Sequence, residues 1–132
     1  MVRFLHTSDL HLGKRYGQMP EDLRGRLTEA RHGVIAKLRD LAISESLDTL
    51  HVAGDIFDTE TPSRATIRQA LQSMGIDPGI QWYLIPGNHD SLQAEELWRT
   101  VDRESPENVT LLRDASPVNL GPDAVLLPAP CP

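Results

Sequence analysis

The chain has 132 residues, 39% of them hydrophobic and 24% charged, and a formal net charge of −6. This is the composition of one soluble globular domain, and no apolar run is long enough to span a membrane. The single cysteine, Cys131, excludes an internal disulfide and, together with the absence of a signal peptide, favours the cytoplasm. The acidic net charge argues against a general attraction to nucleic acid.

Strands and helices are predicted to alternate along the chain. Residues 2–7 indicate a buried strand, and apolar residues spaced three or four apart predict an amphipathic helix over about 21–44. The predicted elements that follow are a strand over 48–53, a helix with Thr61 as N-cap and Pro62 in its first position that ends at Gly75, a strand over 81–85, a helix over about 94–103, and strands over 109–112 and 124–127. This alternation predicts an α/β fold with a largely parallel sheet.

Cationic side chains are concentrated in residues 13–39, which contain seven Lys or Arg residues and three acidic ones. A basic helical face is most simply a solvated surface, and we interpret this segment in that way.

Polar side chains follow each of the first three predicted strands. They are Asp9 and His11 after the first strand, Asp55 and Asp58 after the second, and Asn88, His89 and Asp90 after the third. Residues two apart in extended backbone point to the same side, so Asp9 and His11 should converge. The carboxyl ends of neighbouring parallel strands meet at one edge of a sheet, which predicts a shared cleft. Carboxylates gathered there need cations, and this ligand set suits manganese, iron or magnesium.

Each of these patterns also has a purely structural explanation. An Asp-x-His pair occurs by chance, Gly-Asp after a strand is a common turn, and Asn-His-Asp can be a polar loop. The occurrence of all three at predicted strand ends, in this order, favours a shared metal site.

These motifs resemble a known family. Asp9-x-His11, Gly54-Asp55-x-x-Asp58 and Gly87-Asn88-His89-Asp90 are similar to the first three motifs of the calcineurin-like metallophosphoesterases. The longer runs 11–13, 53–58 and 87–91 resemble the branch that contains the nuclease subunit of the bacterial SbcCD repair complex. The resemblance implies an αββα sandwich and a DNA-repair exonuclease, with DNA as its substrate and an SbcC-like ATPase as a partner. It also implies two divalent metal ions, Mn²⁺ first, with iron or Mg²⁺ as alternatives.

The resemblance also implies a role for each residue of the motifs. Asp9 and His11 would bind the first metal, Asp55 would bridge both metals, and Asn88 would bind the second through its amide oxygen. The two metals would activate a bridging water as hydroxide.

Three further residues would act around these ligands. His89 would stabilise transition-state charge or protonate the leaving oxygen. Asp90 would orient and charge His89, although an ordinary surface position is an equally simple interpretation. Asp58 would hold a metal ligand in place.

No histidine follows His89, whereas members of the family carry further histidines, including a Gly-His-x-His motif. We therefore expect residues 1–132 to form the amino-terminal portion of the phosphoesterase domain, with an incomplete ligand set and an exposed sheet face that promotes self-association. Two alternatives to a nuclease stay open. One is a phosphoesterase acting on nucleotides or phosphoproteins, and the other is a fragment that binds metal without catalysis.

Overall fold

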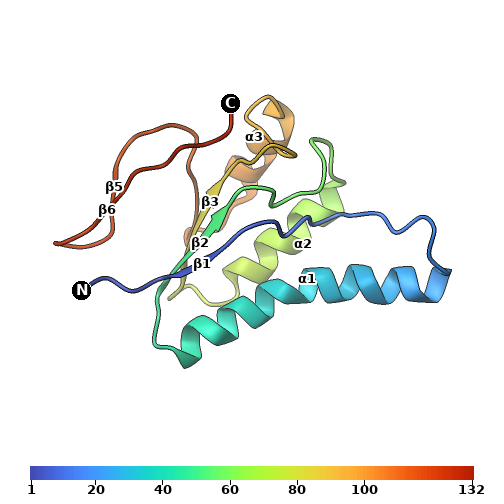
Figure 1. Cartoon of the computed structure of the whole chain (residues 1–132), viewed down its shortest axis with the longest axis horizontal. Helices are drawn as coiled ribbons and strands as arrows, with labels where there is room; N and C mark the ends of the chain where they lie inside the picture. Colours follow the sequence, from blue (N-terminus) through green and yellow to red (C-terminus); the bar gives the residue numbers. More distant parts are fainter.

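The computed structural model describes all of residues 1–132 and contains one parallel sheet of four strands in the order β1-β2-β3-β4 (Figure 1). The strands are β1 (Leu5–Thr7), β2 (Thr49–Ala53), β3 (Gln81–Ile85) and β4 (Val109–Leu111), and the helices are α1 (Glu21–Ser44), α2 (Arg64–Gly75) and α3 (Glu95–Glu104). A separate antiparallel pair consists of β5 (Val118–Asn119) and β6 (Val125–Leu126). The predicted α/β class with a parallel sheet is confirmed. No helix is both long enough and apolar enough to cross a membrane.

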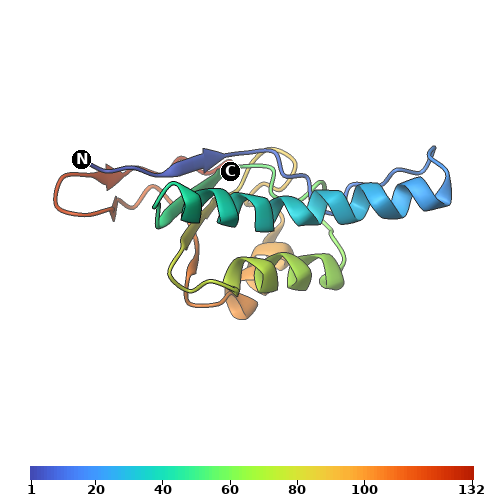
Figure 2. The ribbon, with the colours of Figure 1, turned by 90° about the horizontal axis from the view of Figure 1, so that it is seen from below.

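The three helices lie on the same side of the sheet (Figure 2). Leu50 and Val52 of β2 and Trp82 and Leu84 of β3 are almost completely buried and belong to one apolar core of 20 buried residues. Alternate residues of a strand point to the same face, so these four side chains pack toward the helical layer. The core thus fixes the sheet against the helices and holds the strand ends in place.

The opposite face of the sheet has no helical cover. Phe4 stacks on His51 with ring centroids 4.5 Å apart, and His51 also meets Tyr83 at 5.7 Å. Phe4 remains 46% exposed. The helices and the four-stranded sheet therefore form two layers, which agrees with the amino-terminal part of the expected αββα sandwich. Self-association through this face stays a prediction, which sedimentation equilibrium can test.

Three element boundaries differ from the sequence expectations. The first strand is shorter than residues 2–7 because its pairing with β2 begins only at the Leu5–Leu50 pair. Helix α2 is capped by Ser63, whose hydroxyl accepts a hydrogen bond from the backbone N–H of Thr66 at 3.1 Å, so Pro62 lies outside the helix. The predicted strand at 124–127 is reduced to β6, whose partner β5 was not predicted.

Candidate metal centre

The loops that follow β1, β2 and β3 meet at the carboxyl edge of the sheet, as the parallel topology requires. The backbone N–H of Asp9 donates to the carbonyl of Gly54 at 3.1 Å, and that of His11 donates to the carbonyl of Asp55 at 3.0 Å. These bonds continue the β1–β2 pairing beyond the strands and bring the first two motifs side by side.

The backbone at these motifs is strained. Asp9, His11 and Asp55 have positive φ angles of 58°, 47° and 52°, and the fourth non-glycine residue of this kind, Ser46, lies after α1. The extended backbone expected at Asp9 and His11 was therefore wrong. The two side chains are nevertheless close, since Oδ1 of Asp9 lies 3.5 Å from Nε2 of His11. Left-handed backbone costs of order 1–3 kcal/mol at each such residue, and its concentration at one site is typical of functional loops.

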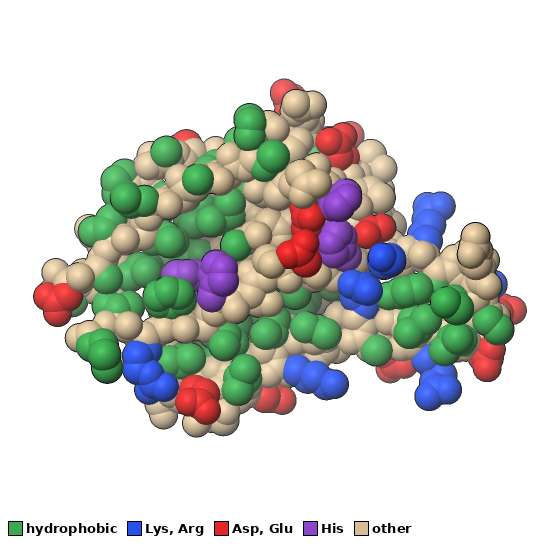
Figure 3. Space-filling view, viewed as in Figure 1, with side chains coloured by type: hydrophobic (Ala, Val, Ile, Leu, Met, Phe, Trp, Pro, Cys, Tyr) green, Lys and Arg blue, Asp and Glu red, His purple; other side chains and the backbone are tan.

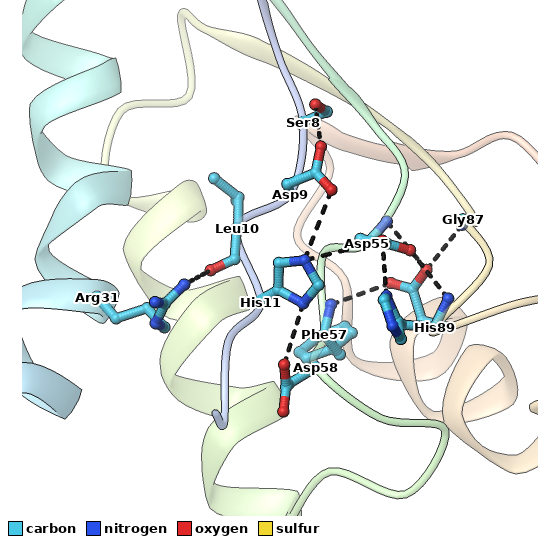
Figure 4. Close-up of polar contacts among 11 residues, drawn as sticks. Ser8, Asp9, Leu10, His11, Arg31, Asp55, Phe57, Asp58, Gly87 and His89 are labelled. Carbon is cyan, nitrogen blue, oxygen red and sulfur yellow. Dashed lines mark hydrogen bonds and ion pairs between the residues drawn. The ribbon is translucent and has the colours of Figure 1, made fainter. Parts of the chain in front are cut away.

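His11 is held between carboxylates on both edges of its ring (Figure 4). Its Nδ1 lies 3.0 Å from Oδ1 of Asp58, and its Nε2 lies 3.8 Å from Oδ2 of Asp55. A carboxylate on one ring nitrogen selects the tautomer and directs the other nitrogen. Asp58 therefore orients Nε2 of His11 toward Asp55.

Asp55 and His89 make two polar contacts with each other. Oδ1 of Asp55 accepts a hydrogen bond from the backbone N–H of His89 at 2.9 Å, and Oδ2 lies 2.8 Å from Nδ1 of the His89 ring. Burial acts to raise the pKa of Asp55, but the hydrogen bonds and charge of His89, with the charge of His11, lower it overall. The hydrogen bond and charge of Asp55 in turn raise the pKa of His89.

His11, Asp55 and His89 offer ligand atoms that all lie within 4.8 Å of one another. Two imidazoles and a carboxylate from three separate loops form a donor set that fits a divalent transition metal. Two of the predicted ligands lie outside this group of three. The side chain of Asp9 is 62% exposed, and Asn88 is exposed on the loop after β3.

Asp90 has different contacts from those expected. Its side chain is fully buried and accepts hydrogen bonds from the backbone N–H groups of Gly87 at 2.7 Å, Phe57 at 3.0 Å and Asp55 at 3.2 Å. Burial raises the pKa of Asp90, and the backbone hydrogen bonds oppose that effect. The alternative of an ordinary surface position is wrong, because the side chain is fully buried and its hydrogen bonds hold the loops after β2 and β3 together. The role of Asp90 in orienting His89 stays a prediction. Its negative charge makes the smallest of the contributions that raise the pKa of His89.

The sequence analysis missed Arg31, which anchors the first loop to α1. Its guanidinium donates to the carbonyl of Leu10 at 2.9 Å and to the hydroxyl of Tyr16 at 2.7 Å. The guanidinium carbon also lies 5.8 Å from the centre of the Tyr16 ring. A signal was present, because Arg31 falls four residues after Leu27 and three before Val34, on the apolar face of the helix.

The chain matches the family described as "Calcineurin-like phosphoesterase" over residues 2–123. It is 33% identical over 132 residues to the SbcD subunit of the nuclease SbcCD of Rhodobacter capsulatus, covering 96% of this chain and 31% of that protein. It is 32% identical to "Uncharacterized metallophosphoesterase YhaO" of Bacillus subtilis, and the match covers 88% of this chain and 29% of that protein. It is 33% identical to "DNA double-strand break repair protein Mre11" of Saccharolobus solfataricus, and the match covers 69% of this chain and 23% of that protein. The chain thus spans less than a third of these relatives.

Proposed function

The chain belongs to the calcineurin-like phosphoesterase family, and from this we propose that it serves as a metal-dependent phosphodiesterase with DNA as its substrate, of the exonuclease type. The observation that carries the proposal is the convergence of His11, Asp55 and His89 from three loops within 4.8 Å. Two of the similar proteins are named as a nuclease subunit and as a DNA double-strand break repair protein, which favours DNA over other phosphoesters. An SbcC-like ATPase subunit is the proposed partner.

In this proposal, His11 and Asp55 hold divalent metal ions, with Asp9 and Asn88 as further ligands at the border of the cluster. Two ions are proposed, with Mn²⁺ as the first candidate. Bound divalent cations would stabilise the negative charge that develops on the phosphoryl group. Asp58 keeps Nε2 of His11 directed into the centre through its 3.0 Å contact with Nδ1.

His89 is the proposed proton donor. Its ring Nδ1 lies 2.8 Å from Oδ2 of Asp55, which places the imidazole beside the proposed metal ligands. The side chain is 53% exposed, so a substrate can reach it from solvent. A protonated, accessible imidazole beside bound phosphate can stabilise transition-state charge or donate to the leaving oxygen.

The first test is Mn²⁺-dependent hydrolysis of bis(p-nitrophenyl) phosphate and of the corresponding monoester by the full chain, with Mn²⁺ binding followed in parallel by isothermal titration calorimetry. His89→Ala is compared with His6→Ala, which removes an exposed histidine from β1 outside the cluster. We expect diesterase activity that requires Mn²⁺ and falls at least about 100-fold in His89→Ala, with the His6→Ala variant close to wild type.

The binding measurement separates two roles for His89. Loss of activity with retained Mn²⁺ affinity means that His89 is a proton donor, whereas loss of both means that it is a metal ligand. A folded wild-type chain that binds Mn²⁺ and hydrolyses neither ester would contradict the proposed catalytic function.

A further inference from the structure

A cavity of about 500 Å³ opens beside the loop that carries the first motif. The cations that line it are Lys14, Arg15 and Arg24, and Thr28 and Thr66 contribute hydroxyl groups. No aspartate or glutamate is among the lining residues. Four other cavities of comparable size each include at least one glutamate. One of them adjoins this cavity, shares Arg24 and Thr28 with it, and contains Glu21 and Glu29. The lining of the cavity beside the first motif is chemically suited to anions.

The three cations of this cavity have no partners of their own. None of them forms an ion pair with a carboxylate, whereas six arginines elsewhere in the chain do. Lys14, Arg15 and Arg24 are all exposed. An acidic protein with a net charge of −6 therefore leaves three unpaired positive charges around one hollow.

The cavity adjoins the metal centre along the chain. Lys14 is three residues from His11, and three residues span at most about 10 Å. Between them, Gly13 turns the backbone with a φ of 84°, and a Cβ at this position would lie 3.3 Å from Cγ2 of Thr66 on α2. Figure 3 shows Lys and Arg side chains in blue beside the purple and red side chains of the centre.

The loop is also fixed in place. Arg31 binds the carbonyl of Leu10 before the cavity and the hydroxyl of Tyr16 within it. The backbone N–H of Lys14 donates to the carbonyl of His11 at 3.2 Å. A loop backbone that is fixed before binding loses less conformational entropy when a ligand arrives, although the Lys14 and Arg15 side chains themselves are free to move.

We propose that Lys14, Arg15 and Arg24 bind the phosphates of a nucleic-acid strand next to the phosphodiester held at the metal centre. The proposal rests on the proposed function and assigns its substrate as an extended polyanion instead of a small phosphoester. Phosphates recur about every 3.4 Å along the axis for each strand, so about 10 Å corresponds to a group up to about three nucleotides away. The cavity therefore gives the site its preference for a chain of phosphates.

The test is binding of a short fluorescein-labelled single-stranded DNA to the full chain, measured by fluorescence anisotropy without metal over a range of salt concentrations. The double variant Lys14→Ala/Arg15→Ala is expected to bind more weakly. The plot of log affinity against log salt should become less steep by about 0.7 for each cation that no longer contacts a phosphate, or by about 1.4 in total. Arg24→Ala should lower the slope by about 0.7.

The matched control is Arg26→Ala/Lys37→Ala, which removes the same charge from exposed positions of α1 outside the cavity. Its slope should stay at the wild-type value. Equal weakening in both double variants would replace the proposed subsite with diffuse attraction and overturn the proposal. Undetectable DNA binding by the wild-type chain at low salt would overturn it as well.

These outcomes are independent of the hydrolysis assay. A wild-type chain that binds DNA with the expected slopes but hydrolyses no diester refutes the proposed function and leaves the subsite standing. A wild-type chain that hydrolyses the diester, while the cavity variants keep the wild-type slope, refutes the subsite alone.

Discussion

The close approach of the loops after β2 and β3 depends on glycine at position 87. A Cβ at this position would fall against the backbone nitrogen and Oδ1 of Asp55, and only 2.9 Å from the carbonyl carbon of Gly54. Ordinary van der Waals contact begins at 3.4 Å, so the two loops would have to separate. Gly87→Ala should therefore displace Asp55, the carboxylate that contacts both histidines of the centre.

The expected cost follows from these contacts. Overpacking in a tightly packed region costs about 1–3 kcal/mol. Asp90 bonds to the backbone N–H of Gly87 on one loop and of Asp55 on the other, at 2.7 and 3.2 Å, so separation also weakens one such bond, worth about 1 kcal/mol. Gly87→Ala should thus lower the free energy of unfolding by about 2–4 kcal/mol. Its Mn²⁺ affinity should fall at least about tenfold, because a displaced support shifts the ligand.

Urea unfolding measures the first effect and calorimetric titration with Mn²⁺ the second. Gly25→Ala is the control, since a Cβ there meets nothing within 4 Å and the residue lies inside α1. Alanine in that helix should raise stability by up to about 1 kcal/mol. A Gly87→Ala protein with an unchanged urea midpoint and unchanged Mn²⁺ affinity would show that the loops yield without cost, and would refute the reasoning.

Three further predictions concern residues outside the ligand cluster. Arg31→Ala frees the first loop from α1 and should lower Mn²⁺ affinity about tenfold by calorimetry, whereas Arg26→Ala on the same helix should not. Burial lowers the pKa of His51 in the folded chain, so below about pH 6.5 the unfolded chain binds more protons than the folded one. The free energy of unfolding therefore falls as the pH drops below that value, by at most about 1.4 kcal/mol per pH unit. Urea midpoints between about pH 7.5 and about pH 5.5 should fall less in His51→Gln than in wild type, and equal falls would contradict this. Asn108→Ala leaves three backbone carbonyls around the α2–β3 connection without the amide that reaches them at 2.9 to 3.2 Å, and thermal unfolding should show a loss of about 1–3 kcal/mol.

Local sequence patterns predicted the elements whose ends are set by nearby residues. Helix α1 occupies Glu21–Ser44 as expected, because its apolar spacing runs through the whole segment. Strand β3 occupies Gln81–Ile85, since Pro86 and Gly87 stop it. The gathering of polar motifs at one edge followed from parallel topology alone. The ends of β1 and the pairing of β6 depend on partner strands, which local patterns do not show.

The internal arrangement of the centre was harder to predict because it depends on contacts between distant residues. Asp90 is polar and lies in a loop, so the sequence suggested either a histidine partner or the surface. Its full burial arises because it accepts N–H groups from residues 33 and 35 positions earlier as well as from its own loop. Asp9 and His11 adopt left-handed backbone where their N–H groups bond to the carbonyls of Gly54 and Asp55, contacts that local sequence does not reveal.

The carboxylates of the centre and the cations of the neighbouring cavity lie on different segments, and this separation affects the direction from which a polyanion would approach. The centre holds Asp9, Asp55 and Asp58 close to two histidines, while Lys14 and Arg15 lie on the loop that begins at Gly13 and Arg24 lies on α1. At physiological salt the screening length is about 8 Å, so most of the chain's net negative charge is screened from a strand at that loop. The lysine and arginine charges that line the cavity act on such a strand at short range. A strand should therefore enter from the cavity side, with its next phosphate brought to the metal ligands, and binding should weaken steeply as salt rises.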